Sequence, residues 1–559
     1  MVADPRPASL REPERIRHWA TKRTRLGNHT EVRYVAVTMR RFPLALIALA
    51  VSTASLVVPQ ERASAAAADA IDFDGDGRGD LVVPVVGEAI EGQANAGAVH
   101  VFYGSPSGVG TDRAQIWSQD AASIRDESEA DDRFGAAWSA GDFNADGRTD
   151  LAVGAPGEDG NVGIVNVLYG SPLGLRAAGN QVWFQDKADM PGTGSALDGF
   201  GSALVAGDFD GDDDDDLAIG APVDAANGTS GAGGGTVTIV YGGSTGLTAA
   251  GAQLIGQNSD GVLGDAEVGD LFGLAMAAGD IDNDGRDDLG VGAPYEDYIG
   301  VDAGTVTLFF GSATGVQTSG SVTLLQGARG LTDSSQAGDT FGSAIEIGYF
   351  DHGPYADLVV GIPGQRVGLS QNAGALMTIP GGAAGLRISR NAILDMGSER
   401  VAGAVRAGTL FGDVLERADF DGNGRDDLVV GVWAFDRNFV PNTGAIITMY
   451  GGTTMFGGAI PSALITQDTD GIVDSAEPND SFGWSVTSVD ANGDGQDGLW
   501  VGVPLEDFGS VTDAGAGHVF GGGGFGLVAQ SSTLWTQSSP GVPDSPQSGD
   551  LFGGDRFFD

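Results

Sequence analysis

The chain has 559 residues, 93 of them glycine and none of them cysteine, and 76 acidic against 29 basic residues give it a formal charge of −47. The lack of cysteine excludes disulfide frameworks, thiolate metal sites and cysteine nucleophiles. The negative charge argues against nucleic-acid binding, because phosphates need basic partners. A hydrophobic content of 41% is too high for a disordered acidic chain, so the composition indicates a folded, turn-rich protein.

The first 68 residues differ in composition from the rest. Residues 1–38 are rich in arginine without periodicity, and we interpret them as a basic N-terminal extension ahead of the better start at Met39. Residues 39–68 join a charged start, an apolar run from Phe42 to Val58 and small residues from Ala63 to Ala68, which is typical of a secretory signal peptide. The run is too short and too interrupted for a transmembrane anchor. We therefore expect a secreted, extracellular protein without a membrane span.

Two motifs recur in phase along residues 69–559. A Phe-Gly pair recurs in phase at seven places, at intervals of 66 to 72 residues, beginning at Phe134, Phe200, Phe272, Phe341, Phe411, Phe482 and Phe552. An acidic nonapeptide also occurs seven times, beginning at Asp72, Asp142, Asp208, Asp280, Tyr349, Asp419 and Asp490. A fixed period of this length is the signature of a repeat architecture in which each repeat is one structural unit.

Each unit contains four segments that read as short strands. FGSALVAGD from Phe200 precedes the acidic loop, LAIGAP from Leu217 follows it, and TVTIVYGG from Thr236 alternates polar and apolar residues. A last segment is exemplified by NQVWFQ from Asn180. Alternation with β-branched and aromatic residues between glycine turns predicts strands. Four strands per unit is the content of one propeller blade, so we expect an all-β fold.

These motifs resemble the FG-GAP repeats of integrin α-subunit head domains. The resemblance rests on Phe-Gly, the acidic loop, and Gly-Ala-Pro at Gly154, Gly220 and Gly292, and it covers residues 69–559. Variants of the last motif begin at Gly361, Gly431 and Gly502. The resemblance implies a seven-bladed β-propeller with calcium-binding hairpins and a ligand surface on the face opposite them.

The two ends of the repeat region complement each other. The first unit has an acidic loop at Asp72 but no preceding Phe-Gly, and the last Phe-Gly at Phe552 has no loop after it. We therefore expect residues 551–559 to form the innermost strand of the blade that begins near Ile71. One blade would then be shared by the N- and C-terminal segments, which leaves no free sheet edge.

The acidic loops carry the residues of an oxygen cage. Carboxylates or amides at positions 1, 3, 5 and 9, a turn at position 6 and a main-chain carbonyl at position 7 favour Ca²⁺, because hard cations prefer oxygen ligands. The predicted ligands are Asp72, Asp74, Asp76, Arg78 and Asp80; Asp142, Asn144, Asp146, Arg148 and Asp150; Asp208, Asp210, Asp212, Asp214 and Asp216; Asp280, Asp282, Asp284, Arg286 and Asp288; Asp419, Asp421, Asn423, Arg425 and Asp427; and Asp490, Asn492 and Asp494. The alternative is a plain Asp-Gly turn, which does not need so many carboxylates.

Three loops depart from the pattern. Tyr349 and Gly353 replace ligands at positions 1 and 5 of the fifth loop, so we expect that site to be weak or empty. Gly498 removes the ninth ligand of the seventh loop, and Asp213 stands at the glycine position of the third, where Asp tolerates left-handed backbone. We expect about five or six Ca²⁺ ions in all.

The sequence offers no catalytic residue that the repeat does not explain. Arg78-Gly79-Asp80 lies within an acidic loop. The GxSxG match from Gly242 lies in a strand-to-strand turn whose other copies have Pro106, Pro172 and Ala313 in place of Ser244. We therefore expect a monomeric adhesion or recognition module for an extracellular protein or glycan. The alternatives are a propeller glycoside hydrolase or polysaccharide lyase with a carboxylate pair at the channel mouth, or a lectin. We expect the ligand to contact variable connections, including Asp126, Glu127, Glu129, Asp265 and Glu267.

Overall fold

The structure is a computed structural model that describes residues 71–225, 233–298 and 300–555. These residues lie in one compact unit of the chain. The basic extension, the expected signal peptide and the last four residues lie outside the described residues.

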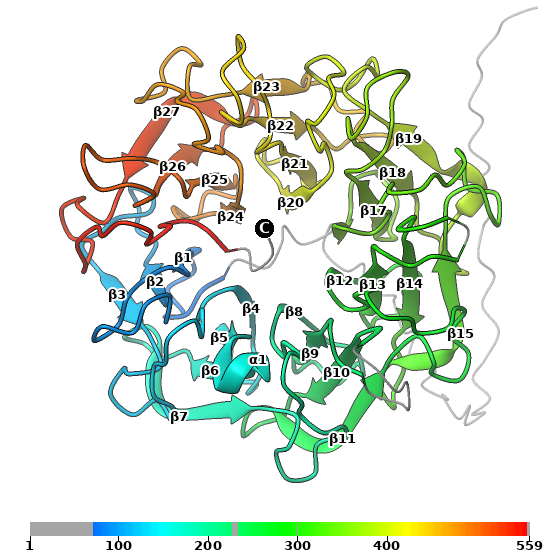
Figure 1. The fold of residues 1–559 in the computed structure, drawn as a ribbon, viewed down its shortest axis with the longest axis horizontal. Coiled ribbons are helices and arrows are strands. Elements are labelled where there is room, and N and C mark those ends of the chain that lie inside the picture. The colour runs from blue at the N-terminus through cyan, green and yellow to red at the C-terminus, as the bar shows by residue number, and fades with distance from the viewer. Residues whose placement is uncertain (1–70, 226–232, 299, 556–559) are drawn as a thin grey trace, which may run out of the picture. The chain divides into compact units, whose positions relative to one another are not determined.

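The described part is nearly all β and forms seven sheets arranged as the blades of a propeller (Figure 1). The first three sheets contain β1 (Leu81–Val85), β2 (Ala98–Phe102) and β3 (Ala114–Trp117); β4 (Ala137–Gly141), β5 (Asp150–Ala155), β6 (Ile164–Tyr169) and β7 (Arg176–Trp183); and β8 (Ala203–Gly207), β9 (Asp216–Ala221), β10 (Thr236–Tyr241) and β11 (Thr248–Ile255).

The fourth and fifth sheets contain β12 (Met276–Gly279), β13 (Asp288–Ala293), β14 (Thr305–Phe310) and β15 (Gln317–Leu324); and β16 (Ile345–Gly348), β17 (Asp357–Ile362), β18 (Ala375–Ile379) and β19 (Ala392–Leu394). The last two contain β20 (Val414–Ala418), β21 (Asp427–Gly431), β22 (Ile446–Met449) and β23 (Ala463–Ile465); and β24 (Val486–Val489), β25 (Gly498–Val503), β26 (Ala516–Gly521) and β27 (Val528–Trp535). Helical structure among the described residues is limited to α1 (Glu158–Asn161) and the 3₁₀ turn η1 (Ile388–Arg390).

Every blade is an antiparallel meander. In the second blade the strand order is β4-β5-β6-β7, and Gly141 at the end of β4 pairs with Asp150 at the start of β5. The acidic loop is the connection between these two strands. Because successive connections of a meander alternate between its two ends, all acidic loops lie on one face of the ring. The β5–β6 connections and the links between blades lie on the other face, as the sequence predicted.

The Phe-Gly motif joins neighbouring blades. Phe134, at the start of the second blade, is fully buried, and its main-chain N–H donates to the carbonyl of Ala96 in the first blade at 2.8 Å. The equivalent bond recurs in the other blades, and the seven phenylalanines are all at most 1% exposed. Each phenylalanine thus fills the core between two blades, where burial of an aromatic ring contributes about 3 kcal/mol.

The C-terminal segment joins the first blade. The N–H of Gly553 donates to the carbonyl of Pro84 at 2.9 Å, and the N–H of Phe552 donates to Ala514 of the last blade at 3.1 Å. Phe552 is fully buried in a cluster with Leu81 and Trp500. The blade shared by both ends of the repeat region is therefore confirmed, although residues 556–559 of its expected inner strand lie outside the described part.

Candidate metal centres

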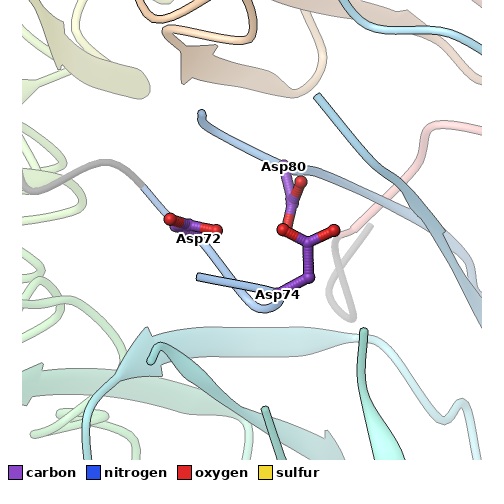
Figure 2. A group of neighbouring side chains, drawn as sticks. All are labelled: Asp72, Asp74 and Asp80. Carbon is purple, nitrogen blue, oxygen red and sulfur yellow. The ribbon is translucent and has the colours of Figure 1, made fainter. Parts of the chain in front are cut away.

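In the first acidic loop, Asp72, Asp74 and Asp80 bring their carboxylates together (Figure 2). One oxygen from each lies within 4.8 Å of the others. The loop is closed by Asp72, whose carboxylate accepts the main-chain N–H groups of Gly75 at 2.7 Å and Gly77 at 2.7 Å. The first aspartate therefore folds the loop around itself. Asp74 also pairs through Oδ2 with Nη2 of Arg113 at 2.7 Å.

The ninth residue anchors the loop to the blade. Asp80 is 1% exposed, and its carboxylate accepts the N–H groups of Phe73 and Gly104, each at 2.9 Å. The pKa of Asp80 is raised to about 7, mainly by burial and also by the charges of Asp74 and Asp72, while the two hydrogen bonds oppose the rise. A buried carboxylate with like-charged neighbours is stabilised when a cation binds between them.

The same grouping of positions 1, 3 and 9 occurs in four loops. The other three sets are Asp208, Asp210 and Asp216; Asp280, Asp282 and Asp288; and Asp419, Asp421 and Asp427. Burial, and then neighbouring aspartates, raise the pKa of Asp216 and Asp288 to about 8 and that of Asp427 to about 9. These Asp clusters can hold a divalent cation.

The second and seventh loops differ in their third and ninth residues. In the second loop Asn144 donates its Nδ2 hydrogen to Asp150 at 2.7 Å, so an amide stands where other loops have a carboxylate. In the seventh loop Gly498 offers no side chain, and the neighbouring Asp497 accepts the N–H of Asp419 in the sixth loop at 2.7 Å. Asp497 therefore serves the adjacent blade and does not replace the missing ligand.

Positions 5 and 7 form ion pairs of their own. The arginine at position 7 lies beside the carboxylate at position 5, with nitrogen–oxygen distances of 3.1 Å for Arg78 and Asp76 and 3.2 Å for Arg286 and Asp284. Arg148 and Asp146 are 3.5 Å apart. These position 5 carboxylates are not among the grouped ligands at positions 1, 3 and 9. The sequence pattern did not indicate that the arginine side chain at position 7 would form an ion pair.

The turn at position 6 has the predicted left-handed backbone. Gly77 has φ of 84° and Gly285 of 91°, and Asp213 adopts φ of 70° at the equivalent place in the third loop. The expectation that Asp213 tolerates this conformation is confirmed. The fifth loop has Pro354 at this position, and proline can neither adopt positive φ nor donate an N–H to a first-position carboxylate. Pro354 is therefore a further reason, besides the two missing ligands, to expect a weak or empty metal site in the fifth loop.

Neighbouring loops are hydrogen-bonded to one another, which the sequence analysis did not foresee. The N–H of the eighth residue of each loop donates to the carbonyl of the first residue of the preceding loop, as Thr149 does to Asp72 at 3.1 Å. The series closes between Gly79 and Asp490 at 2.8 Å. In several loops an aspartate at position 8 also accepts the first residue's N–H, as Asp215 does from Asp142 at 2.7 Å. The acidic loops therefore form a continuous ring.

Two clusters also contain buried oxygen atoms without a hydrogen-bond partner. Among the described residues, Oδ1 of Asp210 and Oδ1 of Asp282, both at position 3, have none. An unpartnered buried carboxylate oxygen is costly unless another group satisfies it. All the grouped ligands are oxygen donors, which suits hard cations such as Ca²⁺ and Mg²⁺ better than transition metals.

The comparisons with known proteins agree with this geometry. The FG-GAP repeat model matches residues 134–168, 200–240 and 272–309, which are parts of the second, third and fourth blades. The chain contains FG-GAP repeats. The sequence-based assignment to an integrin-like FG-GAP propeller is thereby confirmed.

Curated relatives match over a limited length. Phosphatidylinositol-glycan-specific phospholipase D of Rattus norvegicus is 34% identical over 172 residues, or 30% of this chain and 19% of the relative. Integrin alpha-PS3 of Drosophila melanogaster is 38% identical over 153 residues, or 27% of this chain and 13% of the relative. The chain thus spans less than a fifth of these relatives' length.

A rhamnogalacturonan lyase crystal structure aligns with 76% of this chain and 69% of its own, at 10% identity and a TM-score of 0.34. This likeness is too low to support an inference about function. Among the described residues, no helix is long and apolar enough to cross a membrane.

Proposed function

We propose that the protein is a secreted, calcium-loaded propeller that recognises an extracellular ligand on the face opposite the acidic loops. The observation that carries the calcium assignment is the convergence of three carboxylates in four loops, with unpartnered buried oxygens at Asp210 and Asp282. The complete loops would each hold one Ca²⁺, with about five or six ions in all. The secretion part rests on the signal-like sequence of residues 39–68.

The loops in this proposal act as structural clamps. The first and ninth residues tie the loop to itself and to its own blade, and the eighth residue ties it to the preceding blade. A cation held by the first, third and ninth residues would neutralise the repulsion among them and rigidify the face of the ring on which the loops lie. The opposite face then presents its connections from a stable scaffold, which is the usual placement of recognition loops.

The strongest candidate for the ligand surface lies where the third and fourth blades meet. Two cavities of about 440 and 430 Å³ lie next to each other there and share Glu267 and Asp297. Both are formed by the link from β11 to β12 and by the β13–β14 connection. Tyr295 is 41% exposed and Tyr298 is 57% exposed at these cavities.

The charge of these cavities favours a cationic ligand. Their other acidic lining residues are Asp265, Asp270, Glu296 and Asp302. Carboxylates beside exposed aromatic rings suit the ammonium or guanidinium groups of a protein segment rich in lysine and arginine. A protein ligand of this kind therefore fits better than a neutral glycan, although Asp265 and Glu267 were expected from the sequence to serve either.

A binding screen of residues 69–559 would test this function. We expect the protein to bind basic peptides on a mixed peptide and glycan array in the presence of Ca²⁺, with affinity that falls as salt increases. The double variant Asp265→Asn/Glu267→Gln should weaken binding at least ten-fold and leave the number of bound Ca²⁺ ions unchanged. Asp280→Ala should remove one ion and retain most of the binding. Loss of binding in the Asp280 variant with no effect in the double variant would contradict the proposed face.

A further inference from the structure

The first residue of each acidic loop is held by the neighbouring blade. In the second loop, the main-chain carbonyl of Asp142 accepts the N–H of Asp215 at 3.1 Å, and the N–H of Asp142 donates to Oδ2 of Asp215 at 2.7 Å. Asp215 is the eighth residue of the third loop. We call this pair of hydrogen bonds, which one eighth residue makes to the main chain of one first residue, a clasp.

A clasp fixes the orientation of the first ligand. The carboxylate of Asp142 closes its own loop, because it accepts the N–H groups of Asp146 at 3.1 Å and Gly147 at 2.8 Å. The main chain of Asp142 is held by a different blade, through Asp215. Outer partners that orient a metal ligand raise the affinity of the site. Asp215 therefore contributes to the cation site of the second loop without supplying a ligand atom to it.

Clasps form at some blade boundaries and not at others. The bond from the eighth N–H recurs at every boundary, but the second bond needs an acceptor on the eighth side chain. Ala356 of the fifth loop and Gly79 of the first loop have no such acceptor. The clasps therefore join the first four loops into one series and the fifth, sixth and seventh loops into another. The acceptors besides Asp215 are Thr149 at 3.0 Å, Asp287 at 3.2 Å, Asp426 at 2.6 Å and Asp497 at 2.7 Å.

Each clasp also connects two cation sites. Asp215 is followed in the chain by Asp216, which is grouped with Asp208 and Asp210 in the third loop. A cation that orders Asp142 thus also orders Asp215 and the ligand next to it. A second cation then binds to a loop that is already partly ordered, so it pays a smaller entropic cost. By linkage the effect is reciprocal, and each site raises the affinity of the other.

We propose that the eighth residues are positioning residues for the cation sites of the preceding blade, and that the clasps couple neighbouring sites. The coupling extends through the first four loops and, separately, between the sixth and the seventh. This inference rests on the proposed calcium function of the loops. Asp426 provides an internal control, because it forms the same clasp on Tyr349, whose side chain has no carboxylate to position.

Hydrogen exchange followed by mass spectrometry measures each loop separately. Peptides that cover the loops of residues 69–559 are followed as free Ca²⁺ increases, and each loop gives the Ca²⁺ concentration at which it is half protected. Asp215→Ala should raise this concentration about ten-fold for the second loop, and less for the third. Asp215→Asn should resemble the parent, because its carboxamide oxygen still accepts the N–H of Asp142. Asp426→Ala should leave every loop unchanged. A circular dichroism spectrum equal to that of the parent confirms that each variant is folded.

Two ligand variants test the coupling by the same measurement. Asp142→Ala empties the second loop, and it should raise the half-protection concentration of the first and third loops about five-fold and leave that of the sixth unchanged. Asp419→Ala empties the sixth loop and should leave the first and fourth loops unchanged, because Gly79 and Ala356 interrupt the clasps.

The outcomes separate this proposal from the calcium assignment. Loops that are protected by Ca²⁺ but do not respond to Asp215→Ala, or whose first and third members do not respond to Asp142→Ala, would overturn the proposal and leave the calcium assignment intact. An effect of Asp215→Ala confined to the third loop would also overturn it. If Ca²⁺ protected none of the loops, both the calcium assignment and the proposal would be wrong.

Discussion

The acidic loops of the fifth and sixth blades occupy equivalent places but differ in what holds them. In the sixth loop Asp419, Asp421 and Asp427 converge, and Asp419 accepts the N–H groups of Asn423 at 3.0 Å and Gly424 at 2.7 Å. In the fifth loop Tyr349 stands at the first position and Pro354 at the sixth. The hydrogen bonds that wrap the sixth loop around its first carboxylate therefore have no counterpart there.

Basic side chains lie close to the fifth loop. Arg425 donates from Nε to Nδ1 of His352 at 3.1 Å and from Nη1 to the carbonyl of Gly353 at 3.4 Å. Position 5 of its own loop is Asn423, whereas Arg78 and Arg286 pair with an aspartate at that position. Arg286 also donates from Nε to the carbonyl of Asp210 in the preceding loop at 3.3 Å. Arg387 opposes the effects of burial and of the Asp351 charge on the pKa of Asp357, which is raised to about 7.

The difference teaches that the ligand set of the loop can change while its main-chain anchor to the blade is kept. Asp357 still accepts the N–H of Gly381 at 3.0 Å, as Asp427 accepts that of Gly451 at 2.8 Å. Oδ2 of Asp427 also accepts the N–H of Phe420 at 3.0 Å, whereas Oδ2 of Asp357 is buried without a hydrogen-bond partner among the described residues. What changes is the compensation of negative charge. In the fifth loop Arg387 supplies a part of it, and in the sixth we expect a bound ion to supply it.

Chelation should have the largest effect on this comparison, because it empties every complete loop at once. A ligand present at 100 times its Kd stabilises the folded state by about 2.7 kcal/mol per site. We therefore expect EDTA to lower the Tm of residues 69–559 by about 10 °C or more. Differential scanning calorimetry in metal-free buffer, with Ca²⁺ added back as the control, measures the change. An unchanged Tm would contradict the calcium assignment of all the loops.

A packing variant shows how much stability is independent of cations. Phe552→Ala removes a fully buried ring from the joint between the first and last blades, at a cost of about 3–5 kcal/mol. Because this ring lies away from the acidic loops, the loss should be of similar size with Ca²⁺ and with EDTA. Denaturant unfolding under both conditions gives the two values. A loss confined to the calcium-loaded protein would show that ring closure and cation binding are coupled.

Single substitutions in the two loops should separate them. Asp419→Ala should remove one bound Ca²⁺ and about 2–3 kcal/mol of stability at saturating calcium. Asp351→Ala should leave the number of bound ions unchanged, because its loop already lacks the first and fifth ligands. Equilibrium dialysis counts the ions. Equal losses in both variants would refute the difference between the loops.

A loop graft should give the smallest change, a gain of one ion. Replacement of residues 349–357 by the sequence DFDGNGRDD of residues 419–427 restores both the ligands and the left-handed positions. Tyr349→Asp alone should not bind an ion, because Pro354 cannot form the turn. The comparison uses isothermal titration with Ca²⁺. Ca²⁺ binding by the single variant would show that the side-chain ligands alone determine binding in this loop and that the turn at Pro354 does not prevent it.

The sequence alone determined the architecture. The repeat of Phe-Gly, acidic loop and alternating strands predicts blades, because a period-2 pattern between glycine turns specifies half-buried strands wherever the chain runs. The complementary ends of the repeat region also predicted the shared blade. Within the loops, Asp72, Asp74 and Asp80 could be chosen as ligands because their spacing along a tight turn is local information.

Only the tertiary structure decided which groups meet across blades. Gln119 and Glu158 are 39 residues apart and belong to different blades, as are Gln326 and Gln365. The constant spacing was present in the sequence, yet the contact arises only when the ring brings the end of one blade against the β5–β6 connection of the next. The same holds for Asp497 of the seventh loop, whose carboxylate accepts the N–H of Asp419 in the sixth loop. Such contacts depend on how blades are placed around the ring, and no local periodicity encodes that placement.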